Sequence, residues 1–495
     1  MCSKAAGICV LFAFVVGCGQ PKSAKPLGDT PAHADPVGAF LKEMDPNDLE
    51  GAKRALQSIP GPTFEAVVAA LKSKDPDVRW RAAVALGALQ DRRAVGPLLS
   101  CLKGKEIAVR EHAAAALGEI GDARAVQPLI GTLPPESGTL VGRRESSFMA
   151  QLDVPDRFRD AFAKLDYRDS RWVAARALGQ IKAPSAVPAL VRALNDTDYH
   201  LQHSAAWALG EIADARAVAD LVAALKQGNN AYINEPLRKQ VREALCKIGT
   251  PAVEPLIGAL RGREAVLRRD AAEVLGRLKD ARAVQPLACL LSDDEEREVQ
   301  SEAAAALGRI GEPGIETLTL ALSSENWNVR RSAAGALGDA RSPRAVDALV
   351  KALEDKDGMV QTLVAQALGE IRDQRAVPPL SALLKGESRE LREAAAWALA
   401  KIKYPTDPQP LNAAVTSRDL PIIAGAYRYL IMNGSTAAED ALVEALGQHG
   451  DIPMAQVYLN CRNKRLEEAA RKWAADHGVG IGFTSDPPKV LWGRR

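Results

Sequence analysis

Hydrophobic residues recur along most of this chain with the spacing of amphipathic helices. Between residues 122 and 133, the apolar residues Val126, Leu129, Ile130 and Leu133 follow the i, i+3, i+4, i+7 pattern of one helical face. An alanine-rich stretch before it, residues 109–120, repeats this periodicity. The two stretches predict a pair of helices, each with one side buried.

The expected start and stop residues accompany these helices. Asp75-Pro76 places an N-cap residue before a proline at the first helical position. Gly121, Gly249 and Gly311 follow the last turn of other second helices, where a left-handed backbone conformation favours glycine. Caps and apolar periodicity therefore predict the same boundaries.

A Leu-Gly pair recurs near the end of the second helix. Its spacings are 31, 61, 31, 66, 32, 30 and 31 residues, counted between Gly87, Gly118, Gly179, Gly210, Gly276, Gly308, Gly338 and Gly369. Further copies without the glycine centre on Gln57, Cys246, Ala400, Ile431 and a position near Asn460. A unit of about 30 residues cannot bury its own apolar face, so the units must stack. The pattern predicts an all-α solenoid of 13 or 14 helix-pair repeats over residues 43–478.

Two features of this series need a structural explanation. Glycine inside a helix costs about 1 kcal/mol relative to alanine, so its recurrence indicates close backbone approach between neighbouring helices. The 61-residue gap equals two repeats, so residues 134–169 are either an insertion or a degenerate repeat. The sequence leaves both interpretations open.

The repeat reads Asp-x-x-Val-Arg-x-x-Ala-Ala-x-Ala-Leu-Gly-x-Ile-Gly-Asp-x-Arg-Ala-Val-x-Pro-Leu. It resembles the HEAT-like repeat of the phycobilisome-lyase type over residues 45–475. The resemblance implies a right-handed α-α superhelix with first helices on the convex side and second helices on the concave side. That repeat serves scaffolds, adaptors, lyases and a hydroxylase, so it implies a fold and leaves the chemistry open.

An arginine recurs at the start of the second helix, eight residues before the Leu-Gly glycine or the residue that replaces this glycine. These arginines are Arg79, Arg110, Arg238, Arg268, Arg330 and Arg392. The resemblance implies that these arginines pair with aspartates and carbonyl groups of neighbouring loops and fix the stacking. Gln202, Gln300 and Gln361 occupy the same register and could keep a hydrogen bond but no charge.

The N-terminus resembles a bacterial lipoprotein signal. Lys4 precedes the apolar or small residues 5–17, and the sequence Val-Val-Gly-Cys ending at Cys18 resembles a lipobox. The apolar stretch is shorter than the roughly 20 residues that span a bilayer. We expect a signal peptide over residues 1–17, lipidation of Cys18 and a location in the bacterial cell envelope. Gly19 favours the outer membrane, and the alternative is a chance apolar N-terminus.

The remaining ends of the chain lack the repeat. Residues 18–42 are rich in proline and small residues and are expected to form a tether, and residues 479–495 a C-terminal tail. The formal net charge is +2 with acidic and basic residues interspersed, so we expect no nucleic-acid partner. We expect a monomer.

Candidate chemistry is sparse. Cys101, Cys246, Cys289 and Cys461 show no Cys-x-x-Cys spacing, which favours buried apolar roles over disulfides. His200 and His203 are three residues apart and could share a metal, but no third ligand is evident. We therefore predict no metal, no cofactor and no catalytic residue.

Large aromatic residues occupy two positions on the side of the second helix opposite its buried stripe. Seven residues before the Leu-Gly glycine lie Trp80, Trp172 and His203. Three residues before the glycine, or before Ala400 where alanine replaces it, lie Trp207 and Trp397. Exposed aromatic residues are typical of binding surfaces, so these five are our predicted partner-binding residues. The alternative is that the curvature of the solenoid buries them as ordinary packing.

Two classes of function follow. The first is a lipid-anchored envelope scaffold or adaptor that binds a protein or peptide on the concave face. The second, which the resemblance keeps open, is a lyase-like or metal-dependent enzyme that handles a cofactor.

Overall fold

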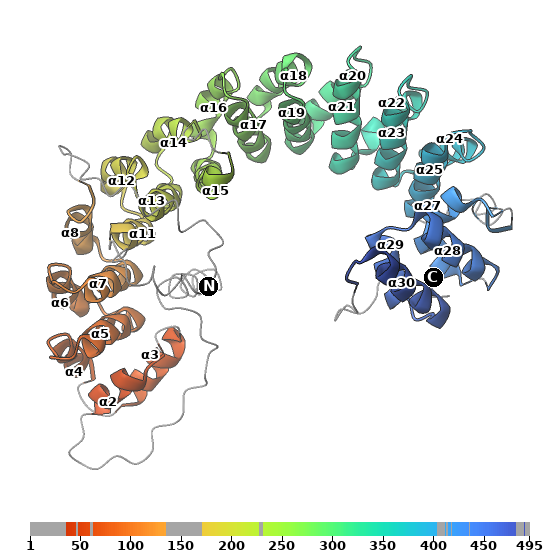
Figure 1. Cartoon of the computed structure of the whole chain (residues 1–495). Coiled ribbons are helices and arrows are strands. Elements are labelled where there is room, and N and C mark those ends of the chain that lie inside the picture. Colours follow the sequence, from red (N-terminus) through yellow and green to blue (C-terminus); the bar gives the residue numbers. More distant parts are fainter. Residues whose placement is uncertain are drawn as a thin grey trace. The chain divides into compact units, whose positions relative to one another are not determined.

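The computed structural model describes residues 36–45, 48–59, 63–134, 171–226, 231–402, 411, 414–416, 418–434, 436–481 and 490. These residues form α-helices and short 3-10 helices, and no strand occurs among them (Figure 1). The chain divides into two compact units, residues 1–255 and 256–495. The predicted signal peptide with Cys18, the greater part of the tether and most of the C-terminal tail lie outside the described residues.

Unit 1, residues 1–255, is a stack of helix pairs in two layers (Figure 1). Its outer layer contains the first helices α4 (Thr63–Ala70), α6 (Val95–Cys101), α8 (Val126–Ile130), α12 (Val187–Leu194) and α14 (Val218–Ala224). Its inner layer contains the second helices α5 (Pro76–Leu89), α7 (Ile107–Ile120), α11 (Arg171–Ile181), α13 (Tyr199–Ile212) and α15 (Ala231–Ile248). Helices α2 (Pro36–Glu43) and α3 (Leu49–Ser58) pack on α5 at the N-terminal end of the stack.

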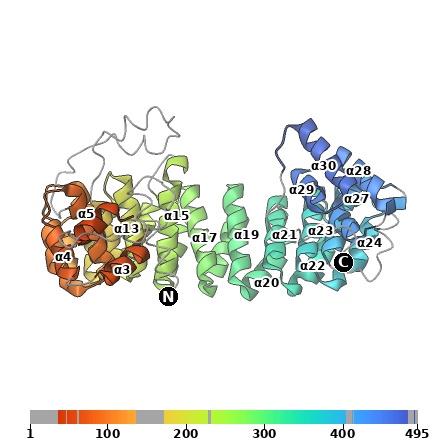
Figure 2. The same ribbon diagram turned by 90° about the horizontal axis from the view of Figure 1, so that it is seen from below.

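Unit 2, residues 256–495, has the same two layers. The inner helices α17 (Ala265–Leu278), α19 (Arg297–Ile310), α21 (Trp327–Ala340) and α23 (Gly358–Ile371) lie side by side in Figure 2, and α25 (Arg389–Lys401) follows them. The outer helices are α18 (Val284–Asp293), α20 (Glu312–Ala321), α22 (Val346–Ala352) and α24 (Val377–Leu383). Helix α16 (Val253–Ala259) contains the boundary between the units. The prediction of an all-α solenoid of helix pairs is confirmed.

Four helices complete the C-terminal end of unit 2. Helix α27 (Leu420–Asn433) packs on α25 and continues the inner layer, and α28 (Thr436–His449) packs on α27. Helices α29 (Ile452–Asn460) and α30 (Lys464–His477) pack on each other, and α30 also contacts α28. The inner layer therefore ends at α27, and α28, α29 and α30 pack together beside it.

The recurring glycines mark close contacts between adjacent inner helices. A Cβ atom added to Gly338 would lie 2.9 Å from the Cα atom of Ala367, and one added to Gly276 would lie 2.6 Å from that of Ala306. In each case the alanine lies two residues before the anchor of the next repeat. The same contact with an alanine Cα occurs at Gly87, Gly118, Gly179, Gly210 and Gly369. The predicted close approach is confirmed, since a methyl group at these positions would force the helices apart.

Helix α7 packs directly on α11, although 50 residues separate them. A Cβ atom on Gly118 would lie 2.9 Å from the Cα atom of Ala177, and the Gln180 amide donates a hydrogen bond of 2.6 Å to the Glu119 carboxylate. This is the ordinary contact between consecutive repeats. Helix α8 is the outer helix beside α11, since the two pack on each other. The segment 134–169, an insertion or a degenerate repeat by its sequence, lies outside the described residues except for Pro134.

The packed structure begins earlier than the tether boundary we expected at residue 42. Helix α2 starts at Pro36, and Val37, Leu41 and Met44 are buried. These apolar side chains cover the end of the stack against α4 and α5. The expectation that residues 36–42 belong to a tether is wrong, because they supply an apolar face that the first repeat needs.

The arginines form the expected ladder between repeats. Arg330 donates to both carboxylate oxygens of Asp355 at 2.6 and 2.9 Å, and to the carbonyl oxygens of Ser324 and Glu325. Arg268 makes the same contacts with Asp294. The neutral Gln361 keeps a hydrogen bond to the Asp355 carbonyl at 2.8 Å. The structural role of this register is therefore confirmed, and Arg171, paired with Asp196 at 2.9 Å, belongs to it too.

The four described cysteines are free thiols in different environments. Cys461 is buried and donates to the Tyr458 carbonyl, and burial raises its pKa. Cys101 and Cys246 are half-buried, whereas Cys289 is exposed on α18. The expectation of a buried apolar role is therefore wrong for Cys289, whose position falls on the outward side of an outer helix.

Candidate functional site

Two surfaces of the inner layer carry the predicted aromatic residues together with charge. The unit 1 ridge consists of Trp172 and Arg176 on α11 with His203 and Trp207 on α13. The unit 2 groove surrounds Trp397 on α25. Each surface lies within one unit and is described separately.

In the unit 1 ridge, Trp207 packs on the neighbouring helix. Its ring edge lies 2.8 Å from where a Cβ atom on Gly179 would be, so the missing side chain makes room for the indole. The guanidinium group of Arg176 lies 4.4 Å from the Trp207 ring centroid, a cation–π distance. Trp207 is consequently half-buried, and it links α13 to α11.

His203 lies one turn before Trp207 and close to positive charge. Burial, with the neighbouring Arg176 and His200, lowers the pKa of His203, and the more distant Glu243 acts in the opposite direction. The Tyr199 ring lies 6.0 Å from the His203 ring. Burial also lowers the pKa of Arg176, whose buried Nε atom has no hydrogen-bond partner among the residues that the structure describes. The four residues of the ridge therefore combine aromatic surface with one cation, the Arg176 guanidinium group.

Trp80 on α5 has a different setting. Its ring lies 4.7 Å from that of His112 on α7, and its Nε1 atom donates to Asp77 at 3.1 Å. Because α7 stands between α5 and α11, Trp80 does not join the unit 1 ridge. The indole mainly packs one repeat against the next.

The five predicted residues are therefore not one continuous exposed ridge. Trp80, Trp172, His203, Trp207 and Trp397 are all half-buried. The indoles of Trp80, Trp207 and Trp397 lie against a neighbouring inner helix. The structure brings Trp172, His203 and Trp207 to adjacent helices, and leaves Trp80 and Trp397 at separate places. Partner binding by these residues stays a prediction.

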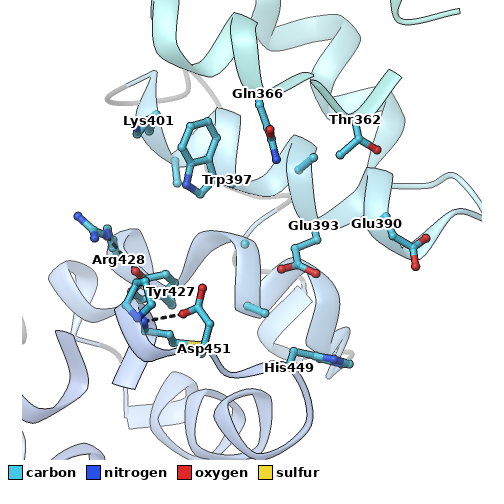
Figure 3. A pocket seen from close by; sticks show the side chains of 16 residues that line it. Thr362, Gln366, Glu390, Glu393, Trp397, Lys401, Tyr427, Arg428, His449 and Asp451 are labelled. Atoms are coloured by element: carbon cyan, nitrogen blue, oxygen red, sulfur yellow. Dashed lines mark hydrogen bonds between the residues drawn. The ribbon is translucent and has the colours of Figure 1, made fainter. Parts of the chain in front are cut away.

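The unit 2 groove is a cavity of about 520 Å³ on the inner face of α23 and α25. Residues of α27, α28 and α29 line the side of the cavity opposite α23 and α25 (Figure 3). The labelled side chains that line it are Thr362, Gln366, Glu390, Glu393, Trp397, Lys401, Tyr427, Arg428, His449 and Asp451. A cavity of this size is in the range of ligand-binding sites, roughly 300–1,000 Å³.

The walls of the groove are held firmly. Trp397 repeats the Trp207 arrangement, since its ring edge lies 2.9 Å from a Cβ atom placed on Gly369. The Tyr427 ring packs 6.1 Å from the ring of Tyr458, whose hydroxyl donates to the Leu442 carbonyl at 3.0 Å. A side chain at Gly425 would clash with the carbonyl oxygen of Glu393, so α25 and α27 approach closely there.

Some charged side chains of the groove have a partner in the part of the protein that the structure describes, and others do not. Lys401 forms an ion pair with Glu370 and lies 4.2 Å from the Trp397 ring centroid. Arg428 donates to the Tyr427 hydroxyl at 3.0 Å. Glu393 makes no hydrogen bond or ion pair through its side chain within the described part of the chain. Burial raises the pKa of Glu393, Arg389 opposes this effect, and Asp451 and Glu390 add to it.

Sequence reasoning missed Arg176, Glu393, Tyr427 and Asp451. Arg176 and Glu393 occupy the same two register positions as the tryptophans, so examining every residue at those positions, whether aromatic or charged, would have found them. Tyr427 and Asp451 belong to the weakest repeats, where the periodicity gives no register. Their place beside Trp397 depends on how the last helices pack.

Two further observations concern metals and membranes. No group of three or more histidine, cysteine, aspartate or glutamate residues suited to a metal ion occurs in the described ranges. Of the helices that the structure describes, none combines the length and apolar character needed to cross a bilayer.

Comparison with known proteins agrees with this architecture. The family model described as HEAT repeats matches residues 35–141, 156–237, 234–308, 287–366, 315–400 and 346–431. The chain belongs to the HEAT-repeat family. Phycocyanobilin lyase subunit alpha of Picosynechococcus sp. (strain ATCC 27264 / PCC 7002 / PR-6) is 35% identical over 122 residues, which is 24% of this chain and 46% of that protein. The chain thus spans less than half of this relative, whose type of repeat is the one the sequence resembles.

Solved structures show the same fold. The karyopherin Kap121p bound to the extreme C-terminus of the protein phosphatase Cdc14p matches with a TM-score of 0.50 and 13% identity, over 86% of this chain and 51% of Kap121p. Kap121p bound to Nup53p matches with a TM-score of 0.50 and 16% identity, over 90% of this chain and 52% of Kap121p. At such identities the likeness concerns the fold alone.

Proposed function

We propose that this protein is a lipid-anchored scaffold or adaptor of the bacterial cell envelope that binds a protein segment on its inner helices. The observation that carries the proposal is the unit 2 groove, where an indole, a tyrosine ring and charged groups surround a cavity of about 520 Å³. HEAT-repeat solenoids, including the karyopherins above, hold other proteins. Two aromatic surfaces at equivalent register positions provide the anchors that dominate protein interfaces.

The anchoring part of the proposal depends on Cys18. In a lipobox the cysteine thiol receives the diacylglycerol, so Cys18→Ala should block lipid attachment and processing. Metabolic labelling with a fatty acid measures this directly, with Cys289→Ala as the matched control. Label that persists on the Cys18→Ala protein would refute the lipid anchor and leave the binding proposal intact.

Partner binding can be tested with a photo-crosslinking residue on each side of the helix layers. We expect a residue at position 172 or 397, on the inner layer, to capture envelope protein. The matched control is position 320 on the outer helix α20, where Leu320 is 78% exposed. Equal capture at all three positions, or capture at position 320 alone, would contradict the proposal.

A further inference from the structure

We propose that the unit 2 groove holds a lysine or arginine side chain of an extended partner segment, between Glu393 and the ring of Trp397. This inference rests on the proposed binding function and specifies the chemistry of the bound segment. Three features of the groove support it: the pairing of its charges, its aromatic rings and the shape of its cavity.

The first step is the charge that the protein itself leaves unbalanced. Glu393 is half-buried on α25, and its side chain makes no hydrogen bond or ion pair to any residue that the structure describes. Asp451 accepts the Met454 N–H at 2.7 Å as the cap of α29, and Glu390 accepts from the Ser388 hydroxyl at 3.3 Å. In Figure 3 the carboxyl groups of Glu393 and Asp451 lie on two sides of one space. Both carboxyl groups therefore line the cavity that an incoming cation would enter.

The second step is that the nearby cations make their side-chain hydrogen bonds to groups other than Glu393. Lys401 is held by Glu370, Arg428 by the Tyr427 hydroxyl, and Arg389 by the His449 ring. Arg389 partly offsets the negative charge on Glu393, while Asp451 and Glu390 increase the field that raises its pKa. A half-buried carboxylate in this setting gains more from a cationic ligand than an exposed one does, because solvent screens the pair less.

The third step is the shape and lining of the cavity. The rings of Trp397 and Tyr427 offer apolar surface for the methylene groups of a lysine or arginine and a face for its charged end. Thr362 and Gln366 on α23 line the same cavity and can hydrogen-bond the backbone of a segment that passes over it. The volume of about 520 Å³ accommodates one long side chain with its flanking backbone.

The test uses two probes that differ only in charge. N-acetyl-arginine amide and N-acetyl-citrulline amide have nearly the same shape, and binding is followed through the indole NMR signal of Trp397, assigned with Trp397→Phe. We expect the arginine probe to bind about tenfold more tightly than the citrulline probe, as for one charged hydrogen-bonded pair. The pentapeptide Ala-Ala-Arg-Ala-Ala, with blocked ends, should bind severalfold more tightly again.

Glu393→Gln should abolish the preference for arginine over citrulline, whereas Glu354→Gln, at an exposed position of unit 2, should leave it unchanged. Equal binding of the two probes, or a preference that survives Glu393→Gln, would overturn the inference. A pentapeptide that binds no better than the single residue would contradict the proposal that the groove holds an extended segment. It would indicate that the ligand is a small cationic molecule. Crosslinking at position 397 with no charge preference would refute this inference while the proposed function stands.

Discussion

Trp207 in unit 1 and Trp397 in unit 2 occupy the same register of the repeat, yet their surroundings differ. Each indole lies against the glycine of the preceding repeat, Gly179 or Gly369, and each lies near a cation, Arg176 at 4.4 Å or Lys401 at 4.2 Å. One turn earlier, however, His203 stands in unit 1 where Glu393 stands in unit 2. The first surface is a ridge with one cation, and the second contains an unpaired carboxylate.

The neighbouring helices produce the second difference. Around Trp207 the inner layer continues from α11 through α13 to α15. Around Trp397 it ends at α27, and the packed α27, α28 and α29 close a cavity over α25. Both surfaces therefore have the tryptophan that the repeat provides. They differ in the residue one turn earlier, His203 or Glu393, and in whether further helices close a cavity beside it. The contacts that stack the repeats can therefore be tested separately from the residues that would bind a ligand.

The largest expected effect concerns the arginine–aspartate pairs that hold neighbouring repeats together. Arg330 and Asp355 have side chains only 4% and 7% exposed, so Arg330→Ala leaves a buried carboxylate unpaired and should cost about 3–5 kcal/mol. In unit 1, Arg110 occupies the same register and donates to the carbonyl oxygens of Gly104 and Lys105, with no carboxylate partner among the described residues, and Arg110→Ala should cost about 1.5 kcal/mol. Urea unfolding followed by circular dichroism measures both. Similar losses would show that the carboxylate pairing does not strengthen the stacking of the repeats.

The next prediction concerns the glycines beneath the two indoles. Gly179→Ala and Gly369→Ala should each cost about 1–3 kcal/mol, because the new methyl group meets both an alanine backbone and a tryptophan ring. Gly335→Ala is the control on α21, where nothing lies within 4 Å, and it should stabilise by up to about 1 kcal/mol. The readout is the urea midpoint. Losses at positions 179 and 369 no larger than at 335 would contradict the close-approach argument.

Truncating the indoles should affect the two surfaces equally in stability and differently in binding. A fully buried Trp→Ala change costs about 3–5 kcal/mol, so the half-buried Trp207 and Trp397 should each lose about 2 kcal/mol. Only Trp397→Ala should remove binding of the arginine-containing pentapeptide. If Trp207→Ala removed it as well, the two surfaces would not be independent. Trp→Phe variants keep most of the packing and serve as controls.

The smallest expected effect is a pH dependence of opposite sign in the two units. His203 has a lowered pKa, so its contribution to stability is lost as the pH falls from about 6.5. Glu393 has a raised pKa, so its carboxyl contributes stability at low pH that is lost as the pH rises through that pKa. Hydrogen exchange of α13 and α25 against pH should therefore change in opposite directions.

His203→Gln and Glu393→Gln should each remove the pH response of their own helix. Glu393→Gln should also stabilise α25 slightly at neutral pH, because it replaces a half-buried unpaired charge with a neutral amide. The two variants serve as controls for each other. A pH response of the same sign in both helices would contradict the assigned environments.

The repeat architecture of this protein can be predicted from its sequence. The periodic Leu-Gly pairs, the arginine ladder and the glutamines at the same register all depend on contacts between neighbouring repeats. Such contacts are local in sequence, and each recurs about 30 residues further on, so the pattern records them many times. For the same reason the aromatic positions of the inner helices, including Trp207 and Trp397, could be placed on one side of the helix from the sequence.

The surroundings of these residues depend on how the folded chain packs, which the sequence pattern does not contain. The structure showed that α7 packs directly on α11 across the 61-residue gap in the glycine series, because Gly118 meets Ala177. It showed that Pro36–Glu43 completes the first repeat, and that each indole is half-buried against its neighbour. The groove exists because Tyr427 and Asp451, from helices with little repeat signal, fold back beside Glu393 and Trp397. A pattern of equal spacings describes each repeat against the next, and it cannot describe the place where the stack ends.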